Sequence, residues 1–315
     1  MMVSATQRDG VSQMASERLE ILSDVCLAPH TTYKVGGNAA LFIHVIDPTT
    51  LQPLLARLEE LNIAWLILGN GSNVLFSDAG FDGAVVRLGE GFAKAEVTLD
   101  AFAPGQHLLE VGAGLSINKL LRFAKTHNLA GVECLGGVPG TVGGAVRMNA
   151  GTVMGEVSDS IESAAVVSAQ EPERWLAKDA LGLSYRHSSL PAGSIVTGAR
   201  FRCTSAEPAM RERLAEVLAY RKATQPLTMP SCGSVFANPP GDHAGRLIEA
   251  CGLKGHRIGG AQVSEVHANW IVNTGDATAS DVKALIEHCI TRVSSEHGVE
   301  LRHEVRLLGD WGVSR

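Results

Sequence analysis

Two glycine-rich segments constrain the fold of this chain more than any other feature of its sequence. Residues 69–73 (Gly-Asn-Gly-Ser-Asn) follow the short apolar run 64–68, and residues 136–144 form the most glycine-dense stretch. Because glycine adopts positive φ angles without strain, successive backbone N–H groups of such a loop can point into one concavity and bind phosphate. Either loop taken singly also fits a tight turn. Two of them in one half of the chain favour a nucleotide-binding domain.

The usual dinucleotide-binding fingerprint is absent from the places where it would be expected. That fingerprint needs three glycines spaced G-x-G-x-x-G directly after a strand. The run Gly69-Asn70-Gly71 continues to Val74, and the run Gly112-Ala113-Gly114 continues to Ile117, so neither has the third glycine. A Rossmann domain is therefore not expected.

Apolar periodicity predicts a chain of mixed strands and helices. Strands are expected at 40–45, 64–68, 84–88, 108–111, 161–167 and 194–202, and amphipathic helices at 50–61, 117–127 and 209–223. After the turn-forming residues 204–208, the runs 244–250, 270–273, 279–297 and 301–308 indicate a second, smaller α+β domain. A length of 315 residues fits two or three domains. We expect a flexible segment at 1–20, a larger domain at 21–205 and a smaller one at 206–315.

Composition narrows the classes of partner. The formal net charge of −6 gives no bulk attraction to nucleic acid or to anionic membranes. No apolar run is long enough to cross a bilayer, and residues 1–20 lack the basic start and apolar centre of a signal peptide. The six cysteines form no Cys-x-x-Cys pair, so neither a metal site nor a dithiol redox pair is expected. We expect a cytoplasmic protein without nucleic-acid or membrane partners.

A small hydroxyl group marks the segment 231–239 (Ser-Cys-Gly-Ser-Val-Phe-Ala-Asn-Pro). Gly233 permits a tight backbone directly before Ser234. The Val-Phe pair that follows favours a strand, and the Asn-Pro pair ends it. The pattern predicts a hydroxyl fixed at the edge of a strand, where it can meet a substrate. A serine in an ordinary turn is the simpler interpretation of this segment alone. Cys232, two residues from Ser234, is a weaker candidate.

Two further segments carry charged groups that suit an active site. Residues 185–190 read Tyr-Arg-His-Ser-Ser-Leu and contain Arg186, and residues 301–309 read Leu-Arg-His-Glu-Val-Arg-Leu-Leu-Gly and contain Glu304. A guanidinium holds a carboxylate by two parallel hydrogen bonds and stays charged. Taken without the other segments, the two residues also fit a surface arginine and an ion pair on an edge strand.

Together with the glycine-rich loops, these three segments resemble the UDP-N-acetylenolpyruvoylglucosamine reductases. The resemblance extends from about residue 27 to residue 309. It implies an α+β chain with the FAD-binding fold of the vanillyl-alcohol-oxidase (PCMH) type, made of two α+β subdomains, followed by a C-terminal α+β substrate-binding domain. It implies a flavoprotein oxidoreductase of peptidoglycan precursor synthesis, and hence of cell-wall biogenesis, cell shape and division.

The resemblance also assigns the cofactor-binding residues. FAD is implied to be held without a covalent bond, with NADPH as co-substrate and no metal. The matching positions are Val35, Gly36, Gly37, Gly69, Asn70, Gly71, Ser72, Asn73, Gly136, Gly137, Pro139, Gly140, Thr141, Gly143, Gly144, Ala145, Ile195 and Val196.

The implied reaction reduces a UDP-linked enolpyruvyl amino sugar to UDP-N-acetylmuramate. NADPH reduces FAD, and the flavin then gives a hydride to C3 of the enolpyruvyl group while a proton is added at C2. By the resemblance, Ser234 is the proton donor, and Arg186 and Glu304 are the other active-site residues. Lys222 and Asn238 match positions near the substrate diphosphate or NADPH. Gln262 lies in a family motif without a role that we can assign.

The interval between Arg186 and Ser234 is short. Some family members carry an additional loop there whose tyrosine closes over the substrate. Here the interval contains one tyrosine, Tyr220, and it lies inside a helical pattern. The chain therefore resembles the subclass that lacks this loop. Two other functions remain open: a flavin oxidase of the same fold acting on another alcohol, which would not need the Arg186, Ser234 and Glu304 set, and a nucleotide-binding module without catalysis.

Overall fold

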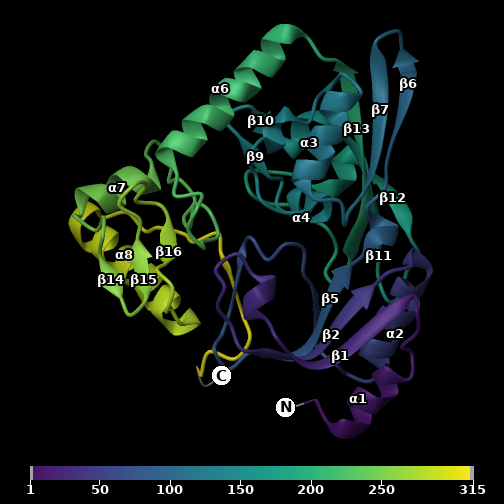
Figure 1. Cartoon of the computed structure of the whole chain (residues 1–315), viewed down its shortest axis with the longest axis horizontal. Coiled ribbons are helices and arrows are strands. Elements are labelled where there is room, and N and C mark those ends of the chain that lie inside the picture. The colour runs from purple at the N-terminus through teal and green to yellow at the C-terminus, as the bar shows by residue number, and fades with distance from the viewer. Residues whose placement is uncertain (1–2, 313–315) are drawn as a thin grey trace. The chain divides into compact units, whose positions relative to one another are not determined.

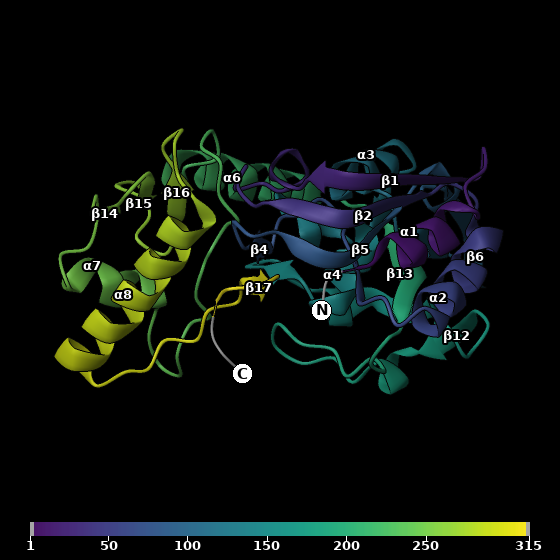
Figure 2. The same cartoon turned by 90° about the horizontal axis from the view of Figure 1, so that it is seen from below.

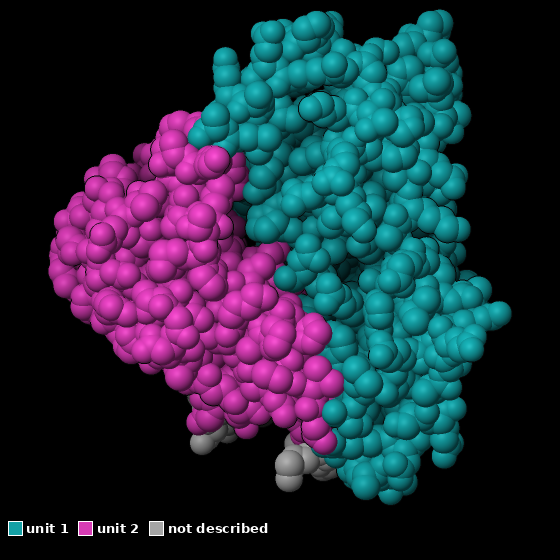
Figure 3. All heavy atoms as spheres, viewed as in Figure 1, with its two compact units in different colours: residues 1–23, 41–70, 83–219 teal, residues 24–40, 71–82, 220–315 magenta. Residues whose placement is uncertain are grey.

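The computed structural model describes residues 3–312 and divides the chain into two compact units (Figure 3). Unit 1 comprises residues 1–23, 41–70 and 83–219, and unit 2 comprises residues 24–40, 71–82 and 220–315. Both units are discontinuous in sequence, and the loop 69–73 contributes its first two residues to unit 1 and its last three to unit 2.

The N-terminal part of unit 1 centres on a four-stranded sheet. Its strands, in spatial order, are β1 (Leu19–Cys26), β2 (Asn38–Val45), β5 (Phe81–Leu88) and β3 (Trp65–Ile67). Strand β3 pairs in parallel with β5. Helix α2 (Leu51–Glu60) buries four leucines spaced three and four apart, the periodicity from which this helix was predicted. The first glycine-rich loop directly follows β3 and residue Leu68.

The second sheet of unit 1 is antiparallel, and its strands come from the rest of the predicted larger domain. Its main path is β12 (Arg174–Ala177), β11 (Ile161–Val167), β13 (Ile195–Ser205), β7 (Gln106–Gly112) and β6 (Ala95–Ala103), with β8 (Leu129–Ala130) paired to β13. Helices α3 (Ile117–Thr126) and α4 (Val142–Arg147) lie against one face of this sheet (Figure 1). The buried side chains of these two helices and of β7, β11 and β13 form one apolar core. A short hairpin, β9 (Gly151–Thr152) and β10 (Gly155–Glu156), leads into α5 (Val157–Ser160).

Unit 2 is built around a long helix, α8 (Ala279–His297), which packs with α7 (Ala244–Ala250) and a three-stranded sheet (Figure 2). The sheet consists of β14 (Arg257–Ile258), β15 (Ala261–Val263) and β16 (Ile271–Asn273). Strands β4 (Val74–Phe76) and β17 (Arg306–Leu308) form a separate parallel pair. Helix α8 begins with a capping box between Thr278 and Asp281 and ends at Gly298 in the left-handed conformation, and it spans the run 279–297 noted in the sequence.

Two parts of the chain differ from the sequence-based description. The segment 1–20, expected to be flexible, contains helix α1 (Ala5–Ser12), which Ser4 and Gln7 cap reciprocally. The compact units separate within helix α6 (Pro208–Thr224), between residues 219 and 220, and place residues 24–40 and 71–82 with the C-terminal part. The proposed domains 21–205 and 206–315 remain a prediction. Among residues 3–312, no helix is both long and apolar enough to cross a membrane.

Candidate active site

The two glycine-rich loops meet inside unit 1. The Asn70 side chain donates a hydrogen bond from Nδ2 to the Gly140 carbonyl oxygen at 3.1 Å. A Cβ atom added to Gly69 would lie 2.7 Å from Thr141 Oγ1, so a larger residue there would force the Thr141 side chain to move. The loops that the sequence predicted separately therefore form one continuous backbone surface.

Residues 140–144 leave room beside helix α4. Gly137 and Gly140 have φ angles of 75° and 146°, which L-residues rarely adopt. Gly144 is exposed, and a Cβ added there would meet only Thr141 Oγ1, at 3.7 Å. The next residue, Ala145, is buried, as are Ile195 and Val196 at the start of β13. The surface is thus open over Gly144 and apolar beneath, which suits a nucleotide.

Unit 2 holds the other glycines of the implied cofactor site. The Thr32 amide donates to the Gly71 carbonyl oxygen at 3.1 Å, and Gly71 has a φ angle of 64°. A Cβ added to Gly36 would lie 2.9 Å from Phe76 Cβ, and one added to Gly37 would lie 2.3 Å from the Asp78 carbonyl oxygen. A Cβ added to Gly71 would lie 2.3 Å from the His30 carbonyl oxygen, so close approaches disfavour side chains at all three cofactor positions. Taken by itself, each unit thus offers glycine backbone that fits the phosphates of FAD.

Ser234 and Glu304 lie on neighbouring backbone segments of unit 2. The Glu304 amide donates to the Val235 carbonyl oxygen at 2.8 Å, and Phe236 forms a bridge with His303. The predicted strand at 235–236 is thus reduced to this bridge. Ser234 itself is exposed, and its hydroxyl makes no hydrogen bond with any other residue of 3–312. The hydroxyl is therefore available to a ligand.

A cofactor-loop residue binds the backbone of Glu304. Asn73 Nδ2 donates to the Glu304 carbonyl oxygen at 3.1 Å, and the Arg306 amide donates to the Asn73 carbonyl oxygen at 3.0 Å. Within unit 2, the Glu304 backbone is therefore hydrogen-bonded both to Val235, the neighbour of the predicted proton donor, and to Asn73 of the predicted cofactor loop.

Sequence reasoning missed Asn269, which holds the segment after Ser234 from its other side. Its Oδ1 accepts from the Phe236 amide at 2.9 Å, and its Nδ2 donates to the Phe236 carbonyl oxygen at 2.8 Å. The Val235 amide donates to the Asn269 carbonyl oxygen at 2.8 Å. The buried Asn269 thus acts like a piece of a neighbouring strand. Its only sequence signal was an amide inside an apolar run.

Arg186 occupies an unusual position in unit 1. Residues 184 and 187 form a bridge, and Arg186, in the two-residue turn between them, has a φ of 54°. The left-handed region is costly for a side-chain-bearing residue, and strain of this kind is concentrated at functional sites. The Arg186 guanidinium donates from Nη2 to the Gly151 carbonyl oxygen at 3.0 Å and lies 5.2 Å from the Tyr185 ring centroid.

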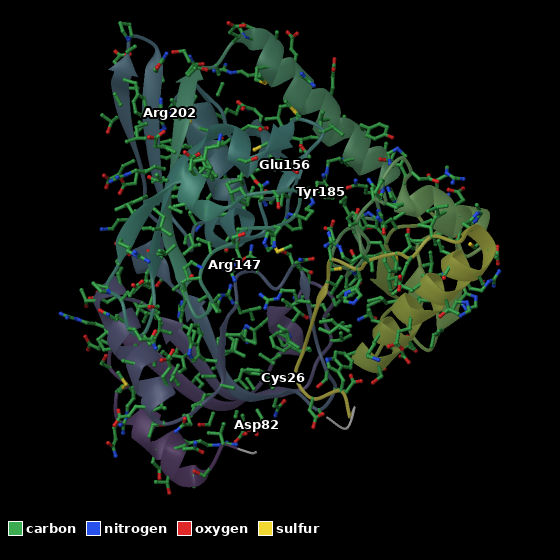
Figure 4. All side chains as sticks on the ribbon, turned by 180° about the vertical axis from the view of Figure 1, so that it is seen from behind. Cys26, Asp82, Arg147, Glu156, Tyr185 and Arg202 are labelled. Carbon is green, nitrogen blue, oxygen red and sulfur yellow. The ribbon has the colours of Figure 1, made fainter. Side chains whose placement is uncertain are left out.

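A second residue that sequence reasoning missed supports this turn. Asn149 is fully buried, and its Nδ2 donates both to Glu156 Oε2 at 2.8 Å and to the Ser184 carbonyl oxygen at 2.9 Å. Figure 4 labels Glu156 and Tyr185 in this region of unit 1. Because Asn149 fixes the start of the turn, it limits the positions that the Arg186 side chain can reach.

The weaker candidates have mixed placements. Lys222 is exposed in the last turn of α6. Asn238 Oδ1 accepts from the Ala244 amide at 3.1 Å and so supports the start of α7. Gln262, on β15, donates from Nε2 to the Gly255 carbonyl oxygen at 3.2 Å, which is a structural contact.

Cys232 is not suited to act as a nucleophile. Burial raises the pKa of its thiol to about 12, and the negative charge of Glu304 contributes in the same direction. Thiolate, not thiol, reacts with alkylating reagents. At pH 8 we therefore expect a short iodoacetamide treatment of the folded protein to label the exposed Cys26 and to spare Cys232, as read by peptide mass spectrometry. Equal labelling of both residues would contradict this assignment.

One group of possible metal ligands occurs among the described residues, outside the segments discussed above. The ligand atoms of Cys251, Glu296 and His297 lie within 4.8 Å of one another. Glu296 Oε1 already accepts a hydrogen bond from Arg292 Nε at 2.8 Å. Since this guanidinium competes with a cation for the carboxylate, we assign no metal to the group.

Known proteins match the chain over both units. The family model for the UDP-N-acetylenolpyruvoylglucosamine reductase C-terminal domain matches residues 225–308, and that for an FAD binding domain matches residues 39–175. A UDP-N-acetylenolpyruvoylglucosamine reductase of Myxococcus xanthus is 44% identical over 295 residues, which cover 93% of this chain and 93% of the relative. The reductase of Halalkalibacterium halodurans is 39% identical, covering 92% of this chain and 95% of its own.

Solved structures agree with these matches. The crystal structure of UDP-N-acetylenolpyruvylglucosamine reductase from Thermus caldophilus has a TM-score of 0.77 at 38% identity and covers 92% of this chain and 99% of its own. A VAO-type flavoprotein from Myceliophthora thermophila, 12% identical with a TM-score of 0.50, covers 95% of this chain and 63% of its own, and supports the fold alone. The predicted α+β fold of the vanillyl-alcohol-oxidase type is confirmed. The chain belongs to the UDP-N-acetylenolpyruvoylglucosamine reductase family and is an FAD-dependent oxidoreductase.

Proposed function

We propose that this enzyme uses NADPH to reduce the UDP-linked enolpyruvyl ether of N-acetylglucosamine to UDP-N-acetylmuramate, in the cytoplasm. The observation that carries the proposal lies in unit 2. There the Ser234 hydroxyl, which has no hydrogen-bond partner among residues 3–312, lies one residue from Val235, whose carbonyl oxygen accepts from the Glu304 amide. The Glu304 carbonyl oxygen accepts in turn from the side chain of the cofactor-loop residue Asn73. A proton donor, a carboxyl group and a flavin-binding segment are the groups that hydride transfer with protonation requires.

Ser234 is the proton donor in this proposal. When bound, FAD supplies the hydride that the enolpyruvyl C3 receives, which moves negative charge through C2 into the substrate carboxylate. Ser234 then donates its proton to C2. A serine hydroxyl is a weak acid, so neighbouring charge must stabilise the alkoxide that it leaves. The exposed position of Ser234 lets its hydroxyl reach the substrate without breaking an existing hydrogen bond.

Arg186 and Glu304 share the charge that develops on the substrate. We assign Arg186 to the substrate carboxylate, because the guanidinium fork matches two carboxylate oxygens and remains charged. We assign Glu304 to stabilisation or protonation of the enediolate-like intermediate. We assign the exposed Lys222 to neutralisation of phosphate charge as a point cation, and we assign Asn238, like Lys222, to the substrate diphosphate or to NADPH.

The cofactor residues of this chain bind FAD without a covalent bond. Glycine backbone in the two loops provides the phosphate contacts, and neither loop contains a histidine or cysteine to which flavin could attach. We therefore expect the purified protein to be yellow and to release all its flavin into the supernatant after acid or heat denaturation. Absorbance at the flavin maximum, measured in supernatant and pellet, checks this. Flavin that stays with the precipitated chain would refute the prediction.

A direct assay tests the proposed reaction. NADPH oxidation should depend on the UDP-linked enolpyruvyl substrate, and mass spectrometry should show a product two hydrogens heavier. A flavin oxidase of the same fold would instead consume oxygen with an alcohol and would ignore this substrate. A colourless protein with neither activity would leave only the nucleotide-binding module.

A further inference from the structure

A tyrosine hydroxyl is buried next to the Ser234 segment. Tyr33 is 0% exposed, and Cys232 Sγ donates a hydrogen bond to Tyr33 Oη at 3.2 Å. Burying a hydroxyl group costs free energy unless it is hydrogen-bonded, and phenylalanine would fill the same space without that cost. Burial also raises the pKa of Tyr33 well above its ordinary value of 10.0, so the hydroxyl stays neutral. The hydroxyl therefore serves as a hydrogen-bonding group rather than as an acid or base.

The backbone around Tyr33 belongs to the cofactor segment. The preceding residue, Thr32, binds the Gly71 carbonyl oxygen through its amide at 3.1 Å and through Oγ1 at 3.2 Å. The Tyr33 carbonyl oxygen accepts from Asn273 Nδ2 at 2.9 Å. Val35 and Gly36, two of the cofactor-binding positions, follow directly in the sequence. The Tyr33 ring thus projects from a backbone that both Gly71 and β16 hold in place.

Gly233 makes the attachment of Cys232 important for Ser234. Its φ is 84°, and a Cβ added there would meet nothing within 4 Å, so no neighbour packs against this residue on that side. Beyond Ser234, the Asn269 amide holds Phe236 on both its N–H and its C=O. After Ser234 the chain is thus held by Asn269 and by the backbone of Glu304, and before Gly233 it is held by the Ser231–Val272 bridge and by the Cys232 side chain.

We propose that Tyr33 is a positioning residue whose hydroxyl, through Cys232, holds the proton donor Ser234 in a fixed place relative to the cofactor segment. The proposal rests on the proposed function, because it requires Ser234 to be the donor. Tyr33 touches neither substrate nor flavin in this role. Loss of its hydroxyl alters where the Ser234 proton points, without altering hydride supply.

The test compares the two half-reactions of the FAD-loaded Tyr33→Phe enzyme by anaerobic stopped-flow. Reduction of the flavin by NADPH should keep the parent rate. Reoxidation by saturating UDP-linked enolpyruvyl substrate should slow roughly 3- to 10-fold, the rate equivalent of one neutral hydrogen bond. The substrate concentration for half-maximal reoxidation should not change. Equal slowing of both halves, or of neither, would overturn the proposal.

Cysteine variants provide an independent measure that does not touch the tyrosine. Cys232→Ala should slow reoxidation as Tyr33→Phe does, whereas Cys232→Ser keeps a hydroxyl donor and should recover part of the rate. In the Tyr33→Phe background the two variants should react at the same rate, because the acceptor is gone. Cys289→Ala, which removes an equally buried thiol from α8, is the matched control and should leave reoxidation unchanged. A rate loss there as large as in Cys232→Ala would reduce the effect to cavity formation.

The Ser234→Ala background separates this inference from the proposed function. If Ser234→Ala alone reoxidises at the parent rate, the proton comes from another group. The assignment of Ser234 as proton donor and the positioning role of Tyr33 then both fail. If Ser234→Ala is slow and adding Tyr33→Phe slows it no further, Tyr33 acts through Ser234 as proposed. If the two losses multiply, Tyr33 acts independently of Ser234 and only the positioning role is refuted.

Discussion

Ser234→Ala is expected to separate the two halves of the catalytic cycle. Flavin reduction by NADPH needs no proton at C2, so the bound flavin should bleach at close to the parent rate. Reoxidation by the enolpyruvyl substrate should slow by ~10²–10⁴, the usual contribution of one general acid. Because the hydroxyl is exposed and unbonded within residues 3–312, its loss should hardly affect folding or FAD content. Anaerobic stopped-flow on each half-reaction measures the split.

Companion variants define what each outcome means. Ser234→Cys should recover some activity, since a thiol also donates a proton. Ser295→Ala removes an exposed hydroxyl from α8 in the same unit and should change neither half-reaction. Equal slowing of both halves in Ser234→Ala would make Ser234 a structural residue. If neither half slows, Glu304 becomes the next candidate, and Glu304→Gln should then abolish reoxidation while FAD is retained.

Elements whose signals are local could be predicted from the sequence. Helix α8 spans the run 279–297 that the sequence analysis assigned to the smaller domain, because its apolar periodicity is a local signal. Its capping residues Thr278 and Asp281 and its terminal Gly298 are also local signals, but they were not recognised. The glycine loops were recognised for a similar reason. Gly71 and Gly140 adopt backbone angles that the residue type itself favours.

Elements that depend on distant neighbours were missed. Strand β6 was missed although its residues 95–100 alternate between apolar and polar side chains; in the structure it is largely exposed and pairs with β7. Helix α1 is short and polar, and its capping box was not recognised. Asn149 and Asn269 act on backbone groups 35 and 33 residues away, and no local pattern distinguishes such amides from surface ones.

The two compact units are discontinuous in sequence because they, too, depend on contacts between distant residues. Residues 24–40 and 71–82 lie within a sequence that alternates strands and helices like its surroundings. They group with the C-terminal part because β4 pairs with β17 and because Tyr33 and Asn73 bind residues more than 190 positions later. Domain boundaries are predicted from the sequence where composition changes. Contacts between segments that are distant in the sequence produce no such change, so they could not be predicted.

Arg186 is expected to show a dissociation between stability and activity. Arg186→Lys keeps the charge but loses the planar fork, so flavin reduction should persist while reoxidation by the substrate falls ~10- to 100-fold, the equivalent of one charged hydrogen bond. Arg186→Gly should remove this function more completely. Yet it should unfold at close to the parent temperature, because relief of the left-handed φ of 54° offsets the lost contacts with Gly151 and Tyr185.

The reason for this expectation is that a turn residue at positive φ is ordinarily glycine, so an arginine there costs about 1–2 kcal/mol that folding alone does not require. Arg202→Lys, on an exposed face of β13 beside Glu162, is the matched control and should change neither half-reaction. Calorimetry of the FAD-loaded variants and stopped-flow of both half-reactions supply the two readouts. A strongly destabilised Arg186→Gly together with a fully active Arg186→Lys would make Arg186 a structural residue of the turn. A stable Arg186→Gly together with a slow Arg186→Lys would show that the strained turn serves the binding of the substrate carboxylate.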